Sequence, residues 1–179
     1  MSFPSLFPHL AQEHLVASFF RRSHGNWRSE RRYYTLNNGE TQEVVSLLSV
    51  EFLELHHPHL IELAQAHNLP AESPLSCGVL TTWNSNYKGP GSKQISGSTV
   101  FGVLGSILYR DRGFATSSPV TADFLLPEPN TLRLRTVYNN STFEEEIKLV
   151  GSNFRTRQTI ISKADEEMMI GQYFEQRLP

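Results

Sequence analysis

Turn-forming residues cut the chain beyond Pro74 into a series of short segments, and this regular division limits the fold more than any other feature. Residues 87–92 form a loop rich in Gly and Pro, residues 126–130 form a turn, and residues 150–153 form another. Short segments bounded in this way are typical of strands. The strands predicted in this part of the chain are residues 76–85, 93–104, 106–112, 120–126, 131–138, 142–150, 153–162 and 168–178.

Two more strands are predicted earlier in the chain. Residues 27–34 alternate with a period of two, and residues 43–52 return as a second strand after the turn at residues 37–39. One face of the first strand is expected to carry Trp27, Ser29, Arg31 and Tyr33. A mixture of aromatic and polar side chains on one face is unusual for a strand that packs on a core.

Two helices are also predicted. Apolar residues from Leu10 to Phe20 recur at loosely helical spacing, and the polar cluster 23–26 ends this helix. A second, short helix is expected after Pro58, because proline is tolerated in the first helical turn. It ends at residues 68–70.

These elements predict an all-β protein with one or two accessory helices. About ten sequential antiparallel strands in a chain of 179 residues tend to close on themselves, because closure removes unpaired edges and encloses a cavity. We therefore expect residues 1–179 to form a single domain, an up-and-down β-barrel, with residues 1–18 as an N-terminal extension and helix.

Composition excludes several classes of protein. A formal net charge of −2 lacks the basic excess of a general nucleic-acid binder. No stretch approaches the roughly 20 apolar residues of a membrane span, and residues 1–10 do not resemble an export signal. Cys77 is the only cysteine, so no internal disulfide can form and a reducing compartment, the cytosol or its equivalent, is expected.

Charged residues in the last three predicted strands are the best candidates for a binding site. Arg155 and Arg157 are two residues apart and so project to the same side, where they suit an anion with two carboxylates. Residues 144–146 are all glutamate, and Glu175 lies in the last strand. The alternative is that these charges form ion pairs on the outside of the barrel.

Other polar groups have simpler explanations. The spacing of His56, His57 and His59 fits no usual zinc site, so no metal site is predicted. The Gly-rich residues 89–93 lack the spacing of a phosphate loop and are interpreted as a hairpin loop. Cys77 has no neighbouring histidine in sequence to act as a base and is expected to be a core residue.

Residues 19–31 read Phe-Phe-Arg-Arg-Ser-His-Gly-Asn-Trp-Arg-Ser-Glu-Arg, and this segment resembles the opening motif of the S-type phycobiliprotein (bilin) lyases, the CpcS/CpeS family with its related U-type members. Later segments resemble further motifs of that family in the same order: residues 76–78 followed by Trp83, and residues 95–100, 112–115 and 152–157. The chain departs from the family pattern at Glu30, Arg32 and the pair Tyr33-Tyr34.

The resemblance implies a barrel like those of the lipocalins and fatty-acid-binding proteins (the calycins). It also implies binding of a linear tetrapyrrole, phycocyanobilin or phycoerythrobilin, and its attachment by a thioether bond to a cysteine of a phycobiliprotein α or β subunit. The bilin is then a bound substrate, and no other cofactor is expected. The compartment implied is the cyanobacterial cytosol, or the plastid stroma or lumen of an alga.

The residues expected to act on the bilin divide into two groups. Glu145, Arg155 and Glu175 are the candidate catalytic residues, because arginine pairs with propionates and a carboxylate stabilises the cationic chromophore. Candidate bilin-binding residues are Arg31, Trp83, Glu144 and Arg157. Trp83 shares a strand face with Cys77 and would pack against the rings or serve only in the core. The nucleophile is expected to be the acceptor's cysteine.

Two alternatives to a complete lyase remain open from the sequence. A barrel of this kind can be a passive carrier of a bilin or lipid, because a fold alone does not define an activity. The protein can also be one subunit of a heterodimeric lyase, or a homodimer. Carrier proteins for fatty acids have mostly aliphatic cavities, whereas Trp, Tyr, Arg and Glu compete for inward positions here.

Overall fold

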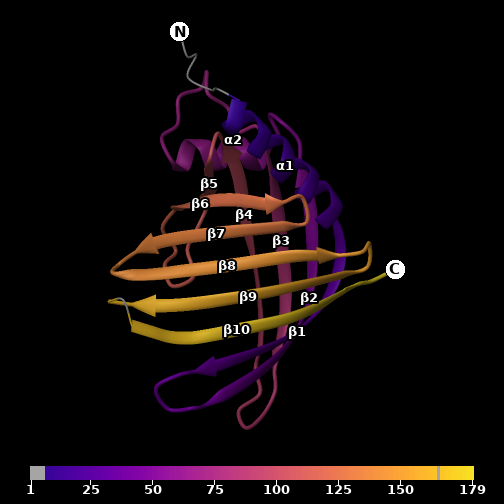
Figure 1. Cartoon of the computed structure of the whole chain (residues 1–179), viewed down its shortest axis with the longest axis vertical. Coiled ribbons are helices and arrows are strands. Elements are labelled where there is room, and N and C mark those ends of the chain that lie inside the picture. Colours follow the sequence, from indigo (N-terminus) through magenta and orange to yellow (C-terminus); the bar gives the residue numbers. More distant parts are fainter. Residues whose placement is uncertain (1–6, 165) are drawn as a thin grey trace.

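Ten antiparallel strands close into one barrel in the computed structural model, which describes residues 7–164 and 166–179 (Figure 1). The strands are β1 (Gly25–Thr35), β2 (Thr41–Leu53), β3 (Cys77–Tyr87), β4 (Gln94–Leu104), β5 (Ile107–Arg110), β6 (Val120–Glu128), β7 (Thr131–Tyr138), β8 (Ser141–Val150), β9 (Phe154–Lys163) and β10 (Glu166–Arg177). Each strand pairs with the next in sequence, and β10 pairs with β1. The predicted up-and-down barrel is confirmed.

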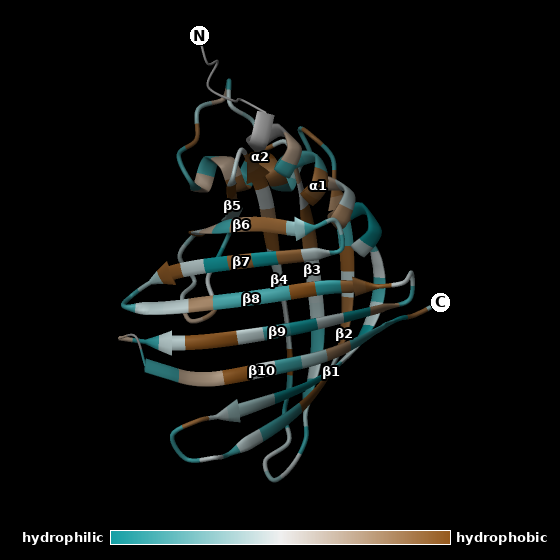
Figure 2. Cartoon of the chain, in the orientation of Figure 1, coloured by the Kyte–Doolittle hydropathy of each residue, from teal (hydrophilic) through white to brown (hydrophobic). Residues whose placement is uncertain are grey.

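Alternation of buried and exposed residues along the strands separates the inside of the barrel from the outside. In β1, Trp27 and Ser29 are buried, whereas Arg28 and Glu30 are exposed. Bands of hydrophobic and hydrophilic colour likewise alternate along strands such as β7 (Figure 2). The predicted inner face of β1 is therefore correct.

Strand β5 is shorter than the predicted segment 106–112 and ends at Arg110. The Asp111 carboxylate accepts hydrogen bonds from the Thr99 hydroxyl at 2.7 Å and from the Val100 N–H at 3.1 Å. The side chain of Asp111 thus takes the Val100 N–H that a longer β5 would have bonded. Residues 111–119 consequently leave the sheet as a loop.

Because neighbouring strands run in opposite directions, successive connections lie at alternate ends of the barrel. The connections that follow the odd-numbered strands β1, β3, β5 and β7 all lie at one end, here called the loop end. At the other end lie the turns at residues 105–106, 129–130 and 151–153, together with helix α1 (Phe7–Ser23) (Figure 1).

Helix α1 crosses this second end and is hydrogen-bonded to a strand and to a turn there. Gln12 accepts a hydrogen bond from the Leu126 N–H at 2.9 Å, and Glu13 accepts one from the Gly105 N–H. Phe19 and Phe20 are buried against the barrel core. The predicted helix and its end at residue 23 are confirmed, while residues 1–6 of the predicted N-terminal extension lie outside the described residues.

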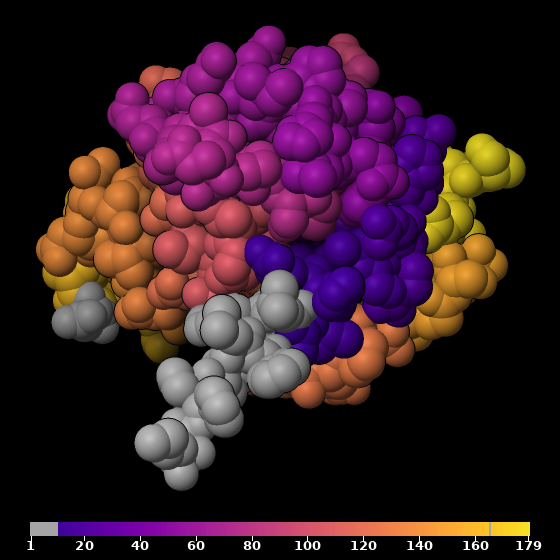
Figure 3. Space-filling view, turned by 90° about the horizontal axis from the view of Figure 1, so that it is seen from above, coloured from indigo at the N-terminus to yellow at the C-terminus, as the bar shows by residue number. Residues whose placement is uncertain are grey.

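Helix α2 (Pro58–Ala66) lies in the long β2–β3 connection and packs on the outer surface of the sheet, beside α1 (Figures 1 and 3). Leu60 and Leu63 are buried in a small second core. Gly78 permits this close packing, since a Cβ there would lie 2.0 Å from the Phe101 carbonyl oxygen and 2.6 Å from Leu60 Cδ2. The two helices of the described chain are not long and apolar enough to span a membrane.

Candidate functional site

A cavity of about 560 Å³ occupies the interior of the barrel. Phe19 and Phe20 of α1 line it from one side, and residues 112–117 of the β5–β6 loop line it at the loop end. Aliphatic side chains form much of the remaining wall: Leu48, Val50, Val79, Leu108, Leu132, Leu134, Ile147 and Ile161. This size and this apolar lining suit an organic ligand of several rings.

Five arginines line the cavity: Arg31, Arg110, Arg112, Arg155 and Arg157. They come from strands β1, β5 and β9 and from the β5–β6 loop. Arginine is rarely buried unless it is paired, so this many inward-facing guanidinium groups need partners within the barrel or on a ligand.

The deepest pair is Arg155 and Glu175. Arg155 Nε donates to Glu175 Oε1 at 2.7 Å, and the two side chains are 7% and 0% exposed. Desolvation alone would raise the pKa of Glu175, but the nearby Arg155 and Arg157 and the hydrogen bond from Arg155 outweigh it and lower the pKa. Glu175 is therefore a carboxylate held in its ionised form by arginine.

Glu145 lies between two arginines. Arg157 donates to Glu145 Oε1, and Arg110 Nη1 lies 3.9 Å from Glu145 Oε2. Desolvation lowers the pKa of Arg157, but Glu145, Tyr173 and Glu175 together more than offset this, and the net pKa is raised. For Arg110, desolvation dominates, and its pKa lies below the ordinary value. Glu145 thus compensates Arg157 well and Arg110 only partly.

Each of these arginines also stacks on an aromatic ring. Arg155 lies over Trp27 at 4.8 Å, and Arg112 lies over Trp83 at 4.9 Å. Arg31 and Arg157 lie over Tyr173 at 5.2 and 5.3 Å. A ring face stabilises a desolvated guanidinium and leaves the N–H groups at its edge free for hydrogen bonds.

Positive charge exceeds negative charge inside the barrel. Against the five arginines stand Glu145, Glu175 and Asp111, whose carboxylate is bonded to the cavity residue Thr99. The described interior therefore carries two positive charges more than it carries negative ones. Such an imbalance favours a ligand with two anionic groups.

Most of the sequence-predicted site residues come together here. Arg31, Trp83, Arg155 and Arg157 line the cavity. Glu145 and Glu175 are buried next to it, behind the arginines that they bind. The alternative of exterior ion pairs is therefore wrong for these glutamates and correct for Glu146, which accepts a hydrogen bond from exposed Arg133 at 2.8 Å.

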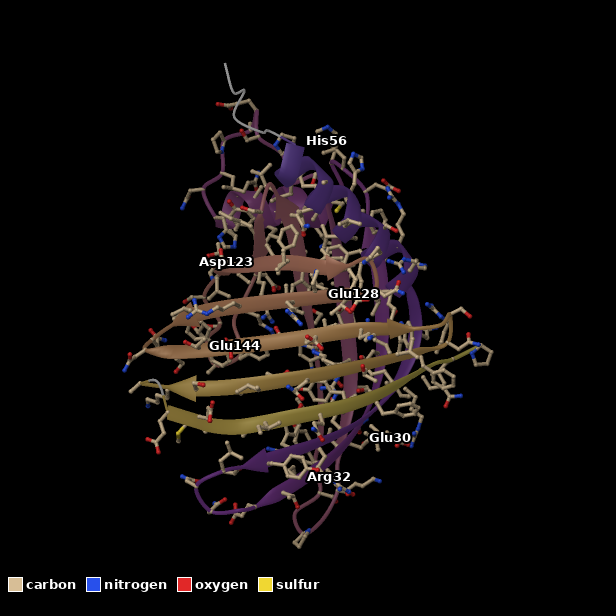
Figure 4. The ribbon with its side chains drawn as sticks, viewed as in Figure 1. Glu30, Arg32, His56, Asp123, Glu128 and Glu144 are labelled. Atoms are coloured by element: carbon tan, nitrogen blue, oxygen red, sulfur yellow. The ribbon has the colours of Figure 1, made fainter. Side chains whose placement is uncertain are left out.

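Glu144 is a correction. It was predicted to bind the ligand, but it is exposed on the outer face of β8 (Figure 4). Neighbouring residues of a strand point to opposite faces, so Glu144 and Glu145 cannot both face the interior. Phe143 and Glu145 take the inward positions.

Sequence reasoning missed three residues of the site: Arg110, Arg112 and Tyr173. Tyr173 is buried and its hydroxyl lies 3.3 Å from that of Thr159, while desolvation raises its pKa, so it remains a neutral phenol. Its alternation with Glu175 was a signal that could have found it. Arg110 lies at the end of a strand of four residues, too short for alternation to indicate a face.

The three histidines at residues 56–59 do not form a metal site with other residues. His57 and His59 have stacked rings 5.3 Å apart at the start of α2. No group of three or more His, Cys, Asp or Glu side chains suited to a metal ion occurs among residues 7–164 and 166–179.

Cys77 is expected to be chemically inert in the folded protein. It is buried in the core, and desolvation raises its pKa from 9.0 to about 11. That difference lowers its thiolate fraction about 100-fold near neutral pH. We expect iodoacetamide at pH 8 to modify Cys77 at least about 100-fold more slowly in the native protein than in urea, as measured by mass spectrometry. Equal rates would show that the thiol is accessible.

The closed antiparallel barrel and its helix-covered end define a calycin-like protein, and the arginine-lined cavity suits an anionic organic ligand. Within that class, the sequence matches the family described as CpeS-like protein over residues 15–178. The chain belongs to this family.

Relatives and a solved structure agree with this assignment. A Nostoc sp. protein provisionally named phycocyanobilin lyase CpcS 2 is 54% identical over 93% of this chain and 92% of its own length. A Picosynechococcus sp. protein provisionally named chromophore lyase CpcV is 49% identical over 90% of this chain and 80% of its own length. The S-type phycobiliprotein lyase CpeS from Guillardia theta has the same fold, with a TM-score of 0.78 at 21% identity over 98% of this chain and 99% of that one.

Proposed function

We propose that the protein is a phycobilin lyase, which binds a linear tetrapyrrole in the barrel and attaches it to a cysteine of a phycobiliprotein subunit. The observation that carries this proposal is the excess of two positive charges inside a cavity that is otherwise lined mainly by apolar side chains. A bilin has two propionates on a long, flat, apolar ring system and matches this interior in charge and in chemistry. The names of the relatives, phycocyanobilin lyase and chromophore lyase, support it.

Binding of a bilin is proposed to proceed by exchange of ion pairs. In the free protein, Arg155 is bonded to Glu175 and Arg157 to Glu145. A propionate that reaches either arginine replaces its glutamate as the anionic partner. The released carboxylate then accepts hydrogen bonds from the pyrrole N–H groups and stabilises the protonated chromophore. The bilin has one basic ring nitrogen, so the protonated chromophore brings two negative charges and one positive charge into the barrel.

The thiol that forms the new bond is assigned to the acceptor. Cys77 is buried and protonated, so it cannot serve. The acceptor's thiolate adds to the ethylidene carbon, the carbon–sulfur bond forms, and the displaced π electrons take up a proton on the ring. No group leaves and no oxidant is needed. A cationic bilin is the better electrophile, so Glu145 and Glu175 assist by stabilising that form.

Positioning is expected to supply most of the rate. Trp83 lines the cavity with Arg112 stacked over it, and both lie close to Gly97, where a Cβ would be 2.6 Å from the Trp83 ring. These groups would fix the face of the bilin that the thiol meets. The protein would act where phycobiliproteins assemble, in the cyanobacterial cytosol or an algal plastid.

The test is a transfer assay in two steps. Phycocyanobilin or phycoerythrobilin is mixed with the purified protein, and the change in absorption gives the dissociation constant. Apo-subunits of a phycobiliprotein are then added, and covalent fluorescence is sought on a denaturing gel. Cys77→Ser is the matched control and is expected to transfer bilin as the wild type does.

The outcomes separate the candidate functions. Binding followed by covalent transfer supports the lyase. Tight binding without transfer, to any subunit tested, would indicate a carrier, and transfer only after addition of a related lyase would indicate a partner subunit. Absence of bilin binding would overturn the proposal.

A further inference from the structure

Arg110 is the buried cavity arginine that has no carboxylate within hydrogen-bond distance among the described residues. Its side chain is only 7% exposed, and its Nε and Nη1 nitrogens are buried without an acceptor within hydrogen-bond distance among the described residues. The nearest carboxylate is Glu145, at 3.9 Å, and Glu145 is bonded to Arg157. Buried donors of a cation left in this state require a partner.

The guanidinium of Arg110 contacts two aromatic rings. Its central carbon lies 4.7 Å from the centroid of the Phe101 ring and 4.7 Å from that of the Phe114 ring. On the outside of the barrel, His67 at the end of α2 bonds to the Arg110 carbonyl oxygen at 2.8 Å. Both the backbone and the side chain are thus oriented before any ligand arrives, which favours a specific binding residue.

Phe114 belongs to the β5–β6 loop, and an aromatic stack fixes the position of this loop. Its ring stacks on Phe143 at 4.7 Å, and Phe143 stacks on Tyr138 at 4.9 Å. The Ala115 N–H donates to the Tyr138 hydroxyl at 2.7 Å. The loop therefore forms a roof over Arg110 at the loop end of the cavity.

We propose that Arg110 is a binding residue for one propionate of the bilin, and that Phe114 is the positioning residue that aims its free N–H edge into the cavity. This inference rests on the proposed function and extends it by naming a residue for one of the two acidic groups. Unlike Arg155 and Arg157, Arg110 can take a propionate without first releasing a hydrogen-bonded glutamate, and it is more deeply buried than Arg31 and Arg112.

The test compares phycocyanobilin with its dimethyl ester, in which both propionates are uncharged. The quantity measured is the ratio of the two dissociation constants, ester over acid. Arg110→Met is expected to lower this ratio by about 10- to 100-fold, the contribution of one charge-assisted hydrogen bond. Arg110→Lys keeps the charge, and its ratio is expected to lie between that of the wild type and that of Arg110→Met. The matched control, Arg133→Met, removes an exposed arginine on the outside of β7 and is expected to leave the ratio unchanged.

Phe114 is tested in the same way. Phe114→Leu keeps Arg110 but removes one of the two rings that its guanidinium contacts. The ratio of the dissociation constants, ester over acid, is therefore expected to fall several-fold, while binding of the ester stays constant. Phe154→Leu is the control, because Phe154 is exposed to a similar degree on the outer face. A purely structural role of Phe114 would weaken binding of acid and ester equally and would overturn its assignment as a positioning residue.

The two proposals fail in different ways. If the wild type binds bilin and folded Arg110→Met or Arg110→Lys keeps the wild-type ratio, the assignment of Arg110 is wrong and the proposed function stands. If the wild type binds neither the acid nor the ester, the proposed function is wrong. The unfolding transition of each variant in urea shows whether it is folded, and Arg110→Lys supplies the test if Arg110→Met is not.

Discussion

Replacing Arg155 by methionine is expected to lower the free energy of unfolding by about 3–5 kcal/mol, because it leaves a buried carboxylate without its partner. Glu175 is fully buried and Arg155 Nε donates to it at 2.7 Å. Methionine fills much of the arginine volume beside Trp27, so the loss is mainly electrostatic. Urea denaturation at neutral pH measures it.

Two variants control this result. Arg155→Met combined with Glu175→Gln removes both charges and is expected to recover more than half of the lost stability. Arg133→Met breaks an exposed ion pair and is expected to cost less than about 1 kcal/mol. If Arg155→Met unfolds within about 1 kcal/mol of the wild type, the buried pair is not as the structure describes it.

The stability difference between the wild type and Arg155→Met is expected to change with pH in one direction. The pKa of Glu175 is lowered from 4.5 in the wild type, so its ionised form stabilises the fold above about pH 4.5, and this contribution is lost as the pH falls through the folded value. Without Arg155, only Arg157 and Arg31 oppose the effect of burial, so the pKa of Glu175 is expected to rise. The deficit of Arg155→Met is therefore expected to shrink as the pH falls from 7 to 5.

Replacing Glu145 by glutamine is expected to slow bilin attachment about 100- to 1000-fold, the effect of removing one preorganised charge from a dry site. The side chain of Glu145 is 1% exposed and bonded to Arg157, and it becomes the partner of the cationic bilin in the proposed exchange. Single-turnover transfer to an apo-subunit measures the rate, with the bilin bound beforehand.

The neighbouring residue provides a matched control. Glu144→Gln makes the same chemical change on the outer face of β8, where no contact with the cavity exists. Its transfer rate is expected to stay within about twofold of the wild type. A Glu145→Gln variant that transfers as fast as Glu144→Gln would remove Glu145 from the mechanism.

Much of the barrel was predictable because local signals and global closure agree. Turn residues mark the strand ends, and the period of two in residues 27–34 identified the inner face of β1, including Trp27 and Arg31. The same period placed Arg155 and Arg157 on one side of β9. These predictions need only the alternation of side chains along one strand.

Other features of the site depend on information that one strand does not contain. Residues 144–146 are all glutamate, so their sequence does not show which of them points into the barrel. The buried positions of Phe143 and Leu149 decide this, and they place Glu145 inside and Glu144 outside, contrary to the prediction. The position of Arg110 at the end of β5 depends on Asp111, whose carboxylate accepts a hydrogen bond from the Val100 N–H of β4. This is a contact between strands, which the sequence of one strand does not reveal. The pairing of Arg155 with Glu175 follows from the register of β9 against β10.

The helix across one end of the barrel leads us to expect an order of steps in the proposed reaction. Phe19 and Phe20 cover the cavity on the side of α1, so in the proposed reaction we expect the bilin and the acceptor subunit both to approach from the loop end. A docked acceptor subunit would block this entrance. We therefore expect the bilin to bind first and to leave the cavity only after it is attached to the acceptor. Excess apo-acceptor should then inhibit loading in a competitive manner.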